Sequence, residues 1–266
     1  MPQTAGLHYE EHGGGDLGPP LVFVHGAGGS RLHWPAALRR LAGRHTLAVD
    51  LPGHGQSPIG ESSGIGAYAR ALAEWSTAVS VHRPVLVGHS MGAAIALTAA
   101  LEEPAALAGL VLVGAGPRLR VNPKLLEGVA QPETFAATVH QIVLWSFAPE
   151  ADAHMVELAR RRMTETGSAV LADDLRACDA FDVTSRLAEI RLPTLIIVGR
   201  KDQMTSLGLS EELQEGIAGS RLRVVESAGH MVMLERPAAM AAVLQSFLRD
   251  LFPSVETFAP AKGDER

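Results

Sequence analysis

The stretch of residues 84–101 joins an apolar run to a helical segment through one short turn. Residues 85–87 have the pattern of a buried strand, and residues 93–101 consist largely of strong helix formers. Between them, residues 88–92 read Gly-His-Ser-Met-Gly, and the two glycines allow a sharp strand-to-helix turn. Such a turn exposes the hydroxyl of its central residue, so Ser90 is the candidate nucleophile.

Short apolar runs alternate with helical patterns along the chain. Besides residues 85–87, the runs at 21–24, 46–50, 110–113, 192–198 and 221–225 predict strands, and the alternation of residues 7–12 predicts a first edge strand. Helical patterns cover residues 65–79 and 237–251. This alternation predicts an α/β fold with a mostly parallel central sheet that helices cover on both faces. In such a sheet, functional groups gather at the carboxyl ends of the strands.

Residues 122–178 lack strand-like runs and contain several helical patterns instead. They separate two strands of one predicted sheet, so we expect an inserted all-helical lid over a cleft. The expected core is therefore discontinuous, with residues 1–116 and 179–253, and the lid comprises residues 117–178. Residues 254–266 have the polar composition expected of a flexible tail.

Composition restricts the class of protein. A chain of 266 residues that is 47% hydrophobic and 20% charged is typical of one soluble globular unit. The net charge is -6 and both signs are interleaved, which argues against binding to nucleic acid. The single cysteine, Cys178, cannot form an internal disulfide, and we find neither a secretory leader nor an apolar run of membrane-spanning length. We therefore expect a cytoplasmic protein without stable membrane insertion, and no sequence feature fixes its oligomeric state.

A glycine-rich bend, His-Gly-Ala-Gly-Gly-Ser at residues 25–30, follows the predicted strand 21–24. Bends of this kind turn main-chain N–H groups into a cleft. The segment lacks the Gly-Lys-Ser/Thr ending of a phosphate loop and the spacing of a dinucleotide fingerprint. We therefore expect the N–H groups of Ala27 and of Met91, the residue after Ser90, to form an oxyanion hole.

Two further groups contain residue types found in catalytic or metal sites. Asp50 ends a predicted strand and His54 lies in the loop after it, but a strand end and a loop need polar groups for their backbone N–H donors, so we assign both a structural role. His8 and His12 match the H-x-x-E-H form of a zinc peptidase, a site that requires a helix. Because glycines fill residues 13–15, a helix cannot continue there, and we expect no metal site.

With these segments assembled, the chain resembles the α/β-hydrolase superfamily, in the esterase, lipase and C–C hydrolase branch with a helical cap. The resemblance rests on residues 25–26, 50–55, 88–92, 199–202 and 229–230 and covers nearly the whole chain. It implies a catalytic serine, acid and histidine in that order, and the matching positions are Ser90, Asp202 and His230. Some members carry the acid after the preceding strand, but residues 114–116 read Gly-Ala-Gly here.

Elementary chemistry agrees with the order that the resemblance implies. A serine hydroxyl needs a base, so His230 would accept the proton of Ser90, and Asp202 would orient the imidazole and stabilise the imidazolium. The implied reaction is hydrolysis of a carboxylic ester through an acyl-enzyme, with no metal or organic cofactor. The serine also argues against the haloalkane dehalogenase and epoxide hydrolase branches, which use an aspartate at this position.

The substrate is less constrained than the reaction. Mostly apolar residues are the candidates for the binding pocket, and no arginine or lysine is obviously placed to clamp a substrate carboxylate. These candidates are Trp34, His89, Trp145, Phe147 and Met155. They favour small to medium esters as the small-molecule substrates. A C–C hydrolase, an enol-lactonase and a cofactor-free perhydrolase stay open, as does a ligand-binding or receptor protein in which turnover is incidental.

Overall fold

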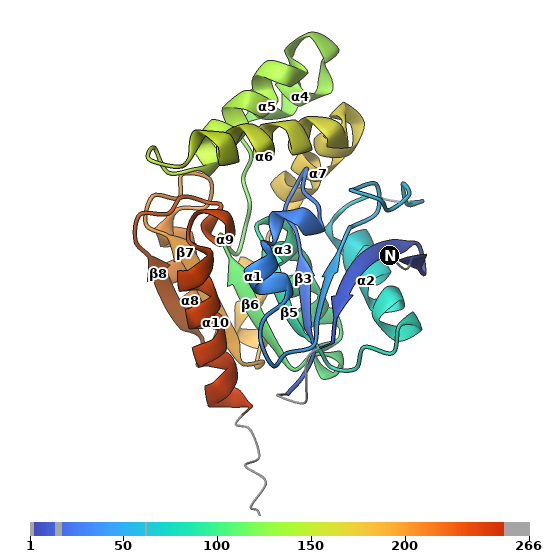
Figure 1. The fold of residues 1–266 in the computed structure, drawn as a ribbon, viewed down its shortest axis with the longest axis vertical. Coiled ribbons are helices and arrows are strands. Elements are labelled where there is room, and N and C mark those ends of the chain that lie inside the picture. The colour runs from blue at the N-terminus through green and yellow to red at the C-terminus, as the bar shows by residue number, and fades with distance from the viewer. Residues whose placement is uncertain (1–2, 14–17, 62, 253–266) are drawn as a thin grey trace, which may run out of the picture.

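The computed structural model describes residues 3–13, 18–61 and 63–252 (Figure 1). The expected tail at residues 254–266 and most of the glycine-rich turn after residue 13 lie outside this part of the chain. The central element is an eight-stranded sheet in the order β1-β2-β4-β3-β5-β6-β7-β8. Its strands are β1 (Gln3–Thr4), β2 (Leu7–His12), β3 (Leu21–Val24), β4 (Thr46–Val49), β5 (Val85–His89), β6 (Gly109–Val113), β7 (Thr194–Gly199) and β8 (Arg221–Val225).

The sheet is mostly parallel, as the sequence predicts. Neighbouring strands from β4 to β8 run parallel, whereas β1 and β2 extend one edge in the antiparallel direction. Every residue of β3, β4, β5, β6 and β7 is buried. Strands buried on both faces read as continuous apolar runs, which explains why the sequence shows such runs rather than alternation. The predicted α/β fold is thereby confirmed.

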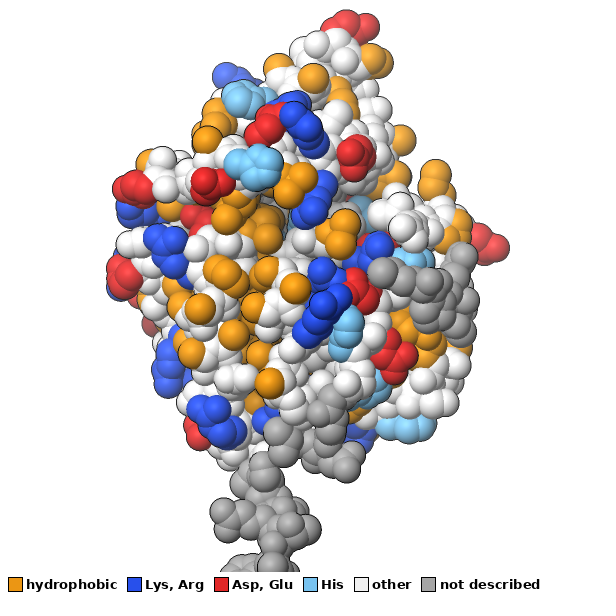
Figure 2. Space-filling model, viewed as in Figure 1, with side chains coloured by type: hydrophobic (Ala, Val, Ile, Leu, Met, Phe, Trp, Pro, Cys, Tyr) orange, Lys and Arg blue, Asp and Glu red, His pale blue; other side chains and the backbone are white. Residues whose placement is uncertain are grey.

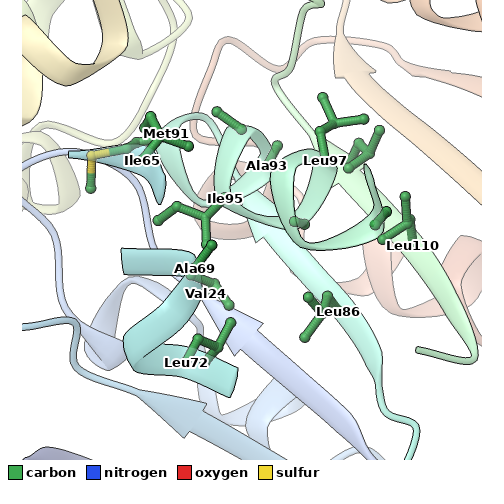
Figure 3. Close-up of a cluster of buried hydrophobic side chains, with 14 of the residues drawn as sticks. Val24, Ile65, Ala69, Leu72, Leu86, Met91, Ala93, Ile95, Leu97 and Leu110 are labelled. Atoms are coloured by element: carbon green, nitrogen blue, oxygen red, sulfur yellow. The ribbon is translucent and has the colours of Figure 1, made fainter. Parts of the chain in front are cut away.

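Helices cover both faces of the sheet. The sheet separates the core into two clusters, one under each layer of helices. The flanking helices are α1 (Ala36–Arg39), α2 (Ile65–Ala78), α3 (Met91–Glu102), α8 (Leu207–Gly216), α9 (Val232–Glu235) and α10 (Pro237–Leu251). Successive side chains of a strand point to opposite faces. Val22 and Val24 therefore join the cluster under α2 and α3 (Figure 3), whereas Leu21 and Phe23 join the cluster under α1 and α10.

Four α-helices lie between β6 and β7 along the chain: α4 (Pro123–Ala130), α5 (Pro132–Ser146), α6 (Ala153–Thr166) and α7 (Ser168–Ala180). In Figure 1, α4, α5 and α6 lie above the sheet, and α7 leads from them toward α3, with which it is in contact. Residues 123–180 are termed the four-helix segment below. The helical lid is predicted at residues 117–178, whereas the helices themselves begin at Pro123 and end at Ala180.

The sequence patterns missed several short elements. Helices α1 and α9 span four residues each, too few to show a helical period. Helix α8 contains Gly208, a weak helix former, and was not expected either. Strand β7 begins at Thr194 rather than at residue 192, because Pro193 has no N–H for the ladder.

The surface mixes charges of both signs. Acidic and basic side chains are interspersed over the face shown in Figure 2. Within the described residues, no helix combines the length and the apolar character that crossing a bilayer requires.

Candidate active site

Ser90 lies at the tip of the turn between β5 and α3, with a φ of 52° and a ψ of -115°. A positive φ is uncommon for a residue with a side chain and persists only where the surroundings enforce it. Close backbone contacts enforce it here. A Cβ at Gly88 would overlap the Gly92 carbonyl, and a Cβ at Gly92 would overlap the Val24 carbonyl. Packing therefore requires both glycines of the turn that holds Ser90.

His230 and Asp202 lie in the loops after β8 and β7 and are joined by a hydrogen bond of 2.9 Å between His230 Nδ1 and Asp202 Oδ2. An ionised carboxylate only accepts hydrogen bonds, so Nδ1 carries a proton, and in the neutral form of the imidazole Nε2 keeps its lone pair. A Cβ at Gly114 would lie 2.9 Å from His230 Nδ1. The end of β6 therefore leaves no space for a side chain where this pair lies.

Donors from its own loop hold the Asp202 carboxylate. Oδ1 accepts the N–H groups of Met204 and Thr205, each at 2.8 Å, and Oδ2 accepts the Thr205 hydroxyl at 2.9 Å. Burial raises the pKa of Asp202, but the charge and hydrogen bond of His230 and the bonds from Thr205 outweigh it, so the pKa lies below its ordinary value. Asp202 is thus ionised at neutral pH. Thr205 is a residue of this site that the sequence patterns missed, although a loop aspartate commonly accepts backbone N–H groups of the residues that follow it.

His89 precedes Ser90 and packs against His230, with 4.6 Å between the ring centroids. Its Nε2 donates to the backbone carbonyl of His230 at 3.1 Å. Burial, followed by the charge at His230, lowers the pKa of His89 well below its ordinary value. His89 therefore steadies the His230 loop while adding no positive charge beside it.

A cavity of about 440 Å³ lies beside Ser90 and His230 and extends under the four-helix segment. Ala27, on the glycine-rich bend, lies on the same lining. Much of the remaining lining is apolar, with Leu119, Val121, Leu125, Ile142, Val143, Ala159, Met163, Leu171, Leu175 and Met231. A concave, largely apolar site with a few polar groups at one place is the usual form of a small-molecule site.

The five predicted substrate-binding residues do not all reach this cavity. His89, Trp145 and Phe147 line it. Trp34 and Met155 are not among the described residues of the lining, which corrects their expected placement. Trp34 is fully buried in the cluster under α1 and α10, and Met155 packs against the same cluster. Aromatic and apolar character predicts burial, but it does not distinguish the wall of a cavity from a packed core.

The glycine-rich bend lies against Ser90. The Gly29 N–H donates to the Gly26 carbonyl at 3.1 Å and closes a β-turn. His25 secures this turn, because its Nδ1 donates to the Gly26 carbonyl at 2.8 Å and its Nε2 accepts the Leu51 N–H at 3.1 Å. A Cβ at Gly26 would lie 3.2 Å from the Cβ of Ser90. The bend therefore approaches Ser90 about as closely as glycine permits.

Asp50 and His54 are fully buried, and neither is among the described residues that line the cavity. Asp50 accepts the N–H groups of Arg31 at 2.8 Å and Gln56 at 3.1 Å. His54 Nε2 lies 2.8 Å from Asp174 Oδ2. These contacts organise the loop after β4, in agreement with a structural role.

The H-x-x-E-H sequence lies in strand β2, which does not bring its histidines together as a helix would. His8 Nδ1 contacts Asp50 Oδ2 at 3.2 Å, and His12 Nε2 contacts Glu10 Oε1 at 2.7 Å. Both imidazoles are therefore engaged by acids near the sheet.

Comparison with known proteins gives consistent relatives. Residues 21–243 match the sequence model of the alpha/beta hydrolase family, a range that includes the four-helix segment. A Variovorax paradoxus (strain S110) protein named as a carbamate hydrolase, RutD, is 30% identical over an alignment 268 residues long, which covers 91% of this chain and 96% of that protein. A pimeloyl-(acyl-carrier protein) methyl ester esterase of Neisseria meningitidis serogroup A is 29% identical over 255 residues, covering 90% of this chain and 80% of that protein. Among solved structures, a thermophilic esterase is 33% identical with a TM-score of 0.81, covering 92% of this chain and 95% of that one.

Proposed function

Because the chain belongs to the alpha/beta hydrolase family, we propose that it is a serine hydrolase that cleaves carboxylic esters through an acyl-enzyme on Ser90. One observation carries the proposal: the hydrogen bond from His230 Nδ1 to Asp202 leaves His230 Nε2 available as a base at the cavity that Ser90 also lines. A positioned base is what converts a serine hydroxyl into a nucleophile. The relative and the solved structure that are named as esterases support an ester as the substrate.

In the proposed reaction, Ser90 Oγ attacks the ester carbonyl while His230 Nε2 takes the hydroxyl proton. The Asp202 carboxylate fixes the tautomer of the imidazole and stabilises the imidazolium. The N–H groups of Ala27 and Met91 hold the oxyanion, and Met91 begins α3, where helix N–H groups lack intrahelical acceptors. His230 then protonates the leaving alkoxide and activates a water molecule, which releases the acid and restores the Ser90 hydroxyl.

The cavity lining favours a neutral acyl group of small to medium size. Its two arginines are already engaged by acids. The Arg118 guanidinium donates to both carboxylate oxygens of Glu212 at 2.5 and 2.9 Å, and Arg120 lies 2.7 Å from Asp182. Among the described lining residues, no other lysine or arginine is present to clamp a substrate carboxylate. A simple ester therefore fits this lining better than an anionic substrate does.

The four-helix segment is proposed to act as a cap over the reacting groups. Each of its helices contributes to the cavity wall, including Leu125 of α4, Ile142 of α5, Ala159 of α6 and Leu171 of α7. Apolar walls exclude water from the acyl group and strengthen the electrostatic interactions of the oxyanion hole. The same walls would set the acyl length that the site accepts.

An active-site-directed fluorophosphonate and a panel of p-nitrophenyl esters test the proposal. We expect stoichiometric labelling of the wild type, no labelling of Ser90→Ala, and unchanged labelling of Ser210→Ala, a buried serine of α8 that bonds the Ala115 carbonyl. Multiple turnovers should accompany the labelling. A burst equal to the enzyme concentration without a steady state would instead identify a ligand-binding protein. Faster cleavage of a lactone or a diketone than of any ester would assign one of the other reactions to the same residues.

A further inference from the structure

Asp174 of α7 is a fully buried carboxylate that receives donors from three separate parts of the sheet domain. Its Oδ2 accepts the Gly28 N–H at 2.9 Å and lies 2.8 Å from His54 Nε2, and its Oδ1 accepts the Tyr68 hydroxyl at 2.9 Å. Burying a carboxylate is costly unless hydrogen bonds and an opposite charge compensate it. The contacts of Asp174 supply both.

The opposite charge comes from the protonated side chain of His54. Both of its ring nitrogens face acceptors, with Nδ1 3.0 Å from the Pro52 carbonyl and Nε2 2.8 Å from Asp174 Oδ2. A ring nitrogen in such a contact carries a proton, so this geometry requires the imidazolium. Burial lowers the pKa of His54, but the charge and hydrogen bond of Asp174 outweigh it, and the pKa lies above its ordinary value. His25, whose ring centroid is 4.8 Å away, is neutral because its Nε2 accepts the Leu51 N–H.

Gly28 is held by the four-helix segment through both its N–H and its carbonyl. The N–H donates to Asp174, and the carbonyl accepts the Thr166 hydroxyl at 3.1 Å. A Cβ at Gly28 would lie 3.0 Å from both Leu171 and Met163. The position of the glycine-rich bend is therefore linked to the position of α6 and α7.

The Asp174 carboxylate selects the form of the turn in this bend. The hydrogen bond from Gly29 to Gly26 closes the turn, and its third residue, Gly28, has a φ of 61°, as a type II turn requires. A type I turn differs mainly by rotation of the peptide between Ala27 and Gly28. That rotation would direct the Ala27 carbonyl, instead of the Gly28 N–H, at the carboxylate. The negative charge of Asp174 disfavours this alternative.

We propose that Asp174 is a positioning residue for the oxyanion hole: by holding the Gly28 N–H, it anchors the turn, and with it the preceding Gly26–Ala27 peptide, whose N–H would face the cavity beside Ser90. The proposal rests on the proposed ester hydrolysis and adds to it a residue of the four-helix segment. Ala27 and Ser90 line the same cavity, whereas Asp174 is not among its described lining residues. Asp174 therefore acts through the turn and not on the substrate.

The first test compares Asp174→Ala with Asp174→Asn. Loss of the acceptor should lower kcat about 30-fold and change KM less than about threefold, because the turn contributes to the transition state and not to ground-state binding. The asparagine keeps an oxygen for Gly28 and can donate its amide to the Tyr68 oxygen, so kcat should stay within about threefold of the wild type. The matched control is Asp179→Ala on the same helix, whose carboxylate accepts the Val121 N–H at 3.0 Å and which should retain kcat.

A second readout isolates the oxyanion hole. A trifluoromethyl ketone forms a tetrahedral adduct with a serine and places an oxyanion in the hole, whereas the corresponding alcohol cannot. The affinity of Asp174→Ala for the ketone should fall about as much as kcat, and its affinity for the alcohol should remain unchanged. An equal loss for both ligands would show a distorted cavity and overturn the positioning role.

A double variant tests whether a loss of kcat in Asp174→Ala comes from misfolding. Asp174→Ala leaves the His54 imidazolium buried without its partner, which is destabilising. Replacing both members with leucine removes both charges, so the Asp174→Leu/His54→Leu protein should fold. It still lacks an acceptor for Gly28, and its kcat should therefore remain low. Recovery of wild-type kcat in the folded double variant would overturn the proposal.

The two proposals fail in different ways. A wild-type protein that neither reacts with the fluorophosphonate nor turns over esters would remove the proposed function, and the role of Asp174 with it. An active wild type in which Asp174→Ala and Asp179→Ala have the same kcat would remove only the role of Asp174.

Discussion

Glu235 Oε1 accepts a hydrogen bond of 2.9 Å from the backbone N–H of Gly229, the residue that precedes His230. Its Oε2 accepts the N–H of Ala148 at 2.9 Å, just beyond the end of α5. Burial raises the pKa of Glu235 above its ordinary value despite these bonds. One side chain of α9 thus joins the His230 loop to the four-helix segment.

Glu235→Gln should therefore destabilise the protein. The amide group of glutamine must face one of the two N–H donors, so one of them loses its acceptor. We expect a loss of about 1–3 kcal/mol in the free energy of unfolding, measured by urea denaturation, together with lower kcat. Glu226→Gln, an exposed residue paired with Arg200, is the control and should change stability by less than about 0.5 kcal/mol. Equal stability of the two variants would contradict the role of Glu235.

Asp202→Asn should remove most of the proposed esterase activity while the protein remains folded. An amide at this position can donate to His230 Nδ1 and favour the tautomer with the proton on Nε2, which cannot accept the Ser90 proton. Triads of this type lose about 10³- to 10⁴-fold in kcat on this change. Steady-state kinetics should show KM within about threefold of the wild type. A loss below tenfold would mean that another group acts as the acid.

Ala159→Phe should shift the acyl preference toward shorter chains. Ala159 is buried on α6 and lines the cavity, so the larger ring occupies space that a long acyl group would need. The ratio of kcat/KM for p-nitrophenyl octanoate to that for the acetate should fall about tenfold. An unchanged ratio would place the acyl group elsewhere in the cavity.

Acid should destabilise the protein through its buried neutral histidines. Burial, with smaller contributions from the charges of Arg162 and His54, lowers the pKa of His33 from 6.5 to about 4. Between these values the unfolded chain binds a proton that the folded protein does not, so stability is complete above 6.5 and declines as the pH falls toward 4. The loss from this residue is about 3 kcal/mol. Urea unfolding from pH 7.5 to 4 should show a shallower decline for His33→Gln, and identical slopes would contradict this assignment.

Substitution by alanine should lower the stability of the protein at one glycine, Gly92, and raise it at another, Gly208. A Cβ at Gly92 overlaps the Val24 backbone, so Gly92→Ala should cost several kcal/mol, about 3 or more, or prevent folding. Gly208 lies in α8, and the nearest atom to an added Cβ is Ser206 Oγ at 3.9 Å. Gly208→Ala should therefore stabilise the protein by about 0.5–1 kcal/mol in thermal or urea unfolding. A destabilised Gly208→Ala would show that this helix is not formed as described.

Local sequence patterns predicted the sheet and the positions after its strands. The apolar runs correspond to β3, β4, β5, β6 and β7, because burial on both faces requires mostly apolar residues. Ser90, Asp202 and His230 follow β5, β7 and β8, so knowledge of the strands located all three candidates. The hydrogen bond between Asp202 and His230 follows from the arrangement of strands, which puts β7 beside β8.

Long-range partners could not be read from the sequence. Asp174 lies 146 residues from Gly28, and although the helical period puts it on the buried face with Leu171 and Leu175, that period does not identify its partners. Glu235 is one of several acids near the C-terminal helix. The buried roles of both depend on which backbone N–H groups the folded chain leaves without acceptors, a property of the tertiary structure. Trp34 was misplaced for a related reason, since its neighbours are set by packing.

Strands β6 and β7 are adjacent and parallel, with Leu110 opposite Thr194, so the chain leaves the sheet at the carboxyl end of β6 and returns at the amino end of the neighbouring strand. An exchange of the intervening helices for those of another protein would leave the ladder of the sheet intact. Such chimaeras offer a direct route to new substrate preferences on an unchanged set of reacting groups. The graft would have to bring its own acceptor for the Gly28 N–H, because the recipient sheet would lose the one that Asp174 supplies.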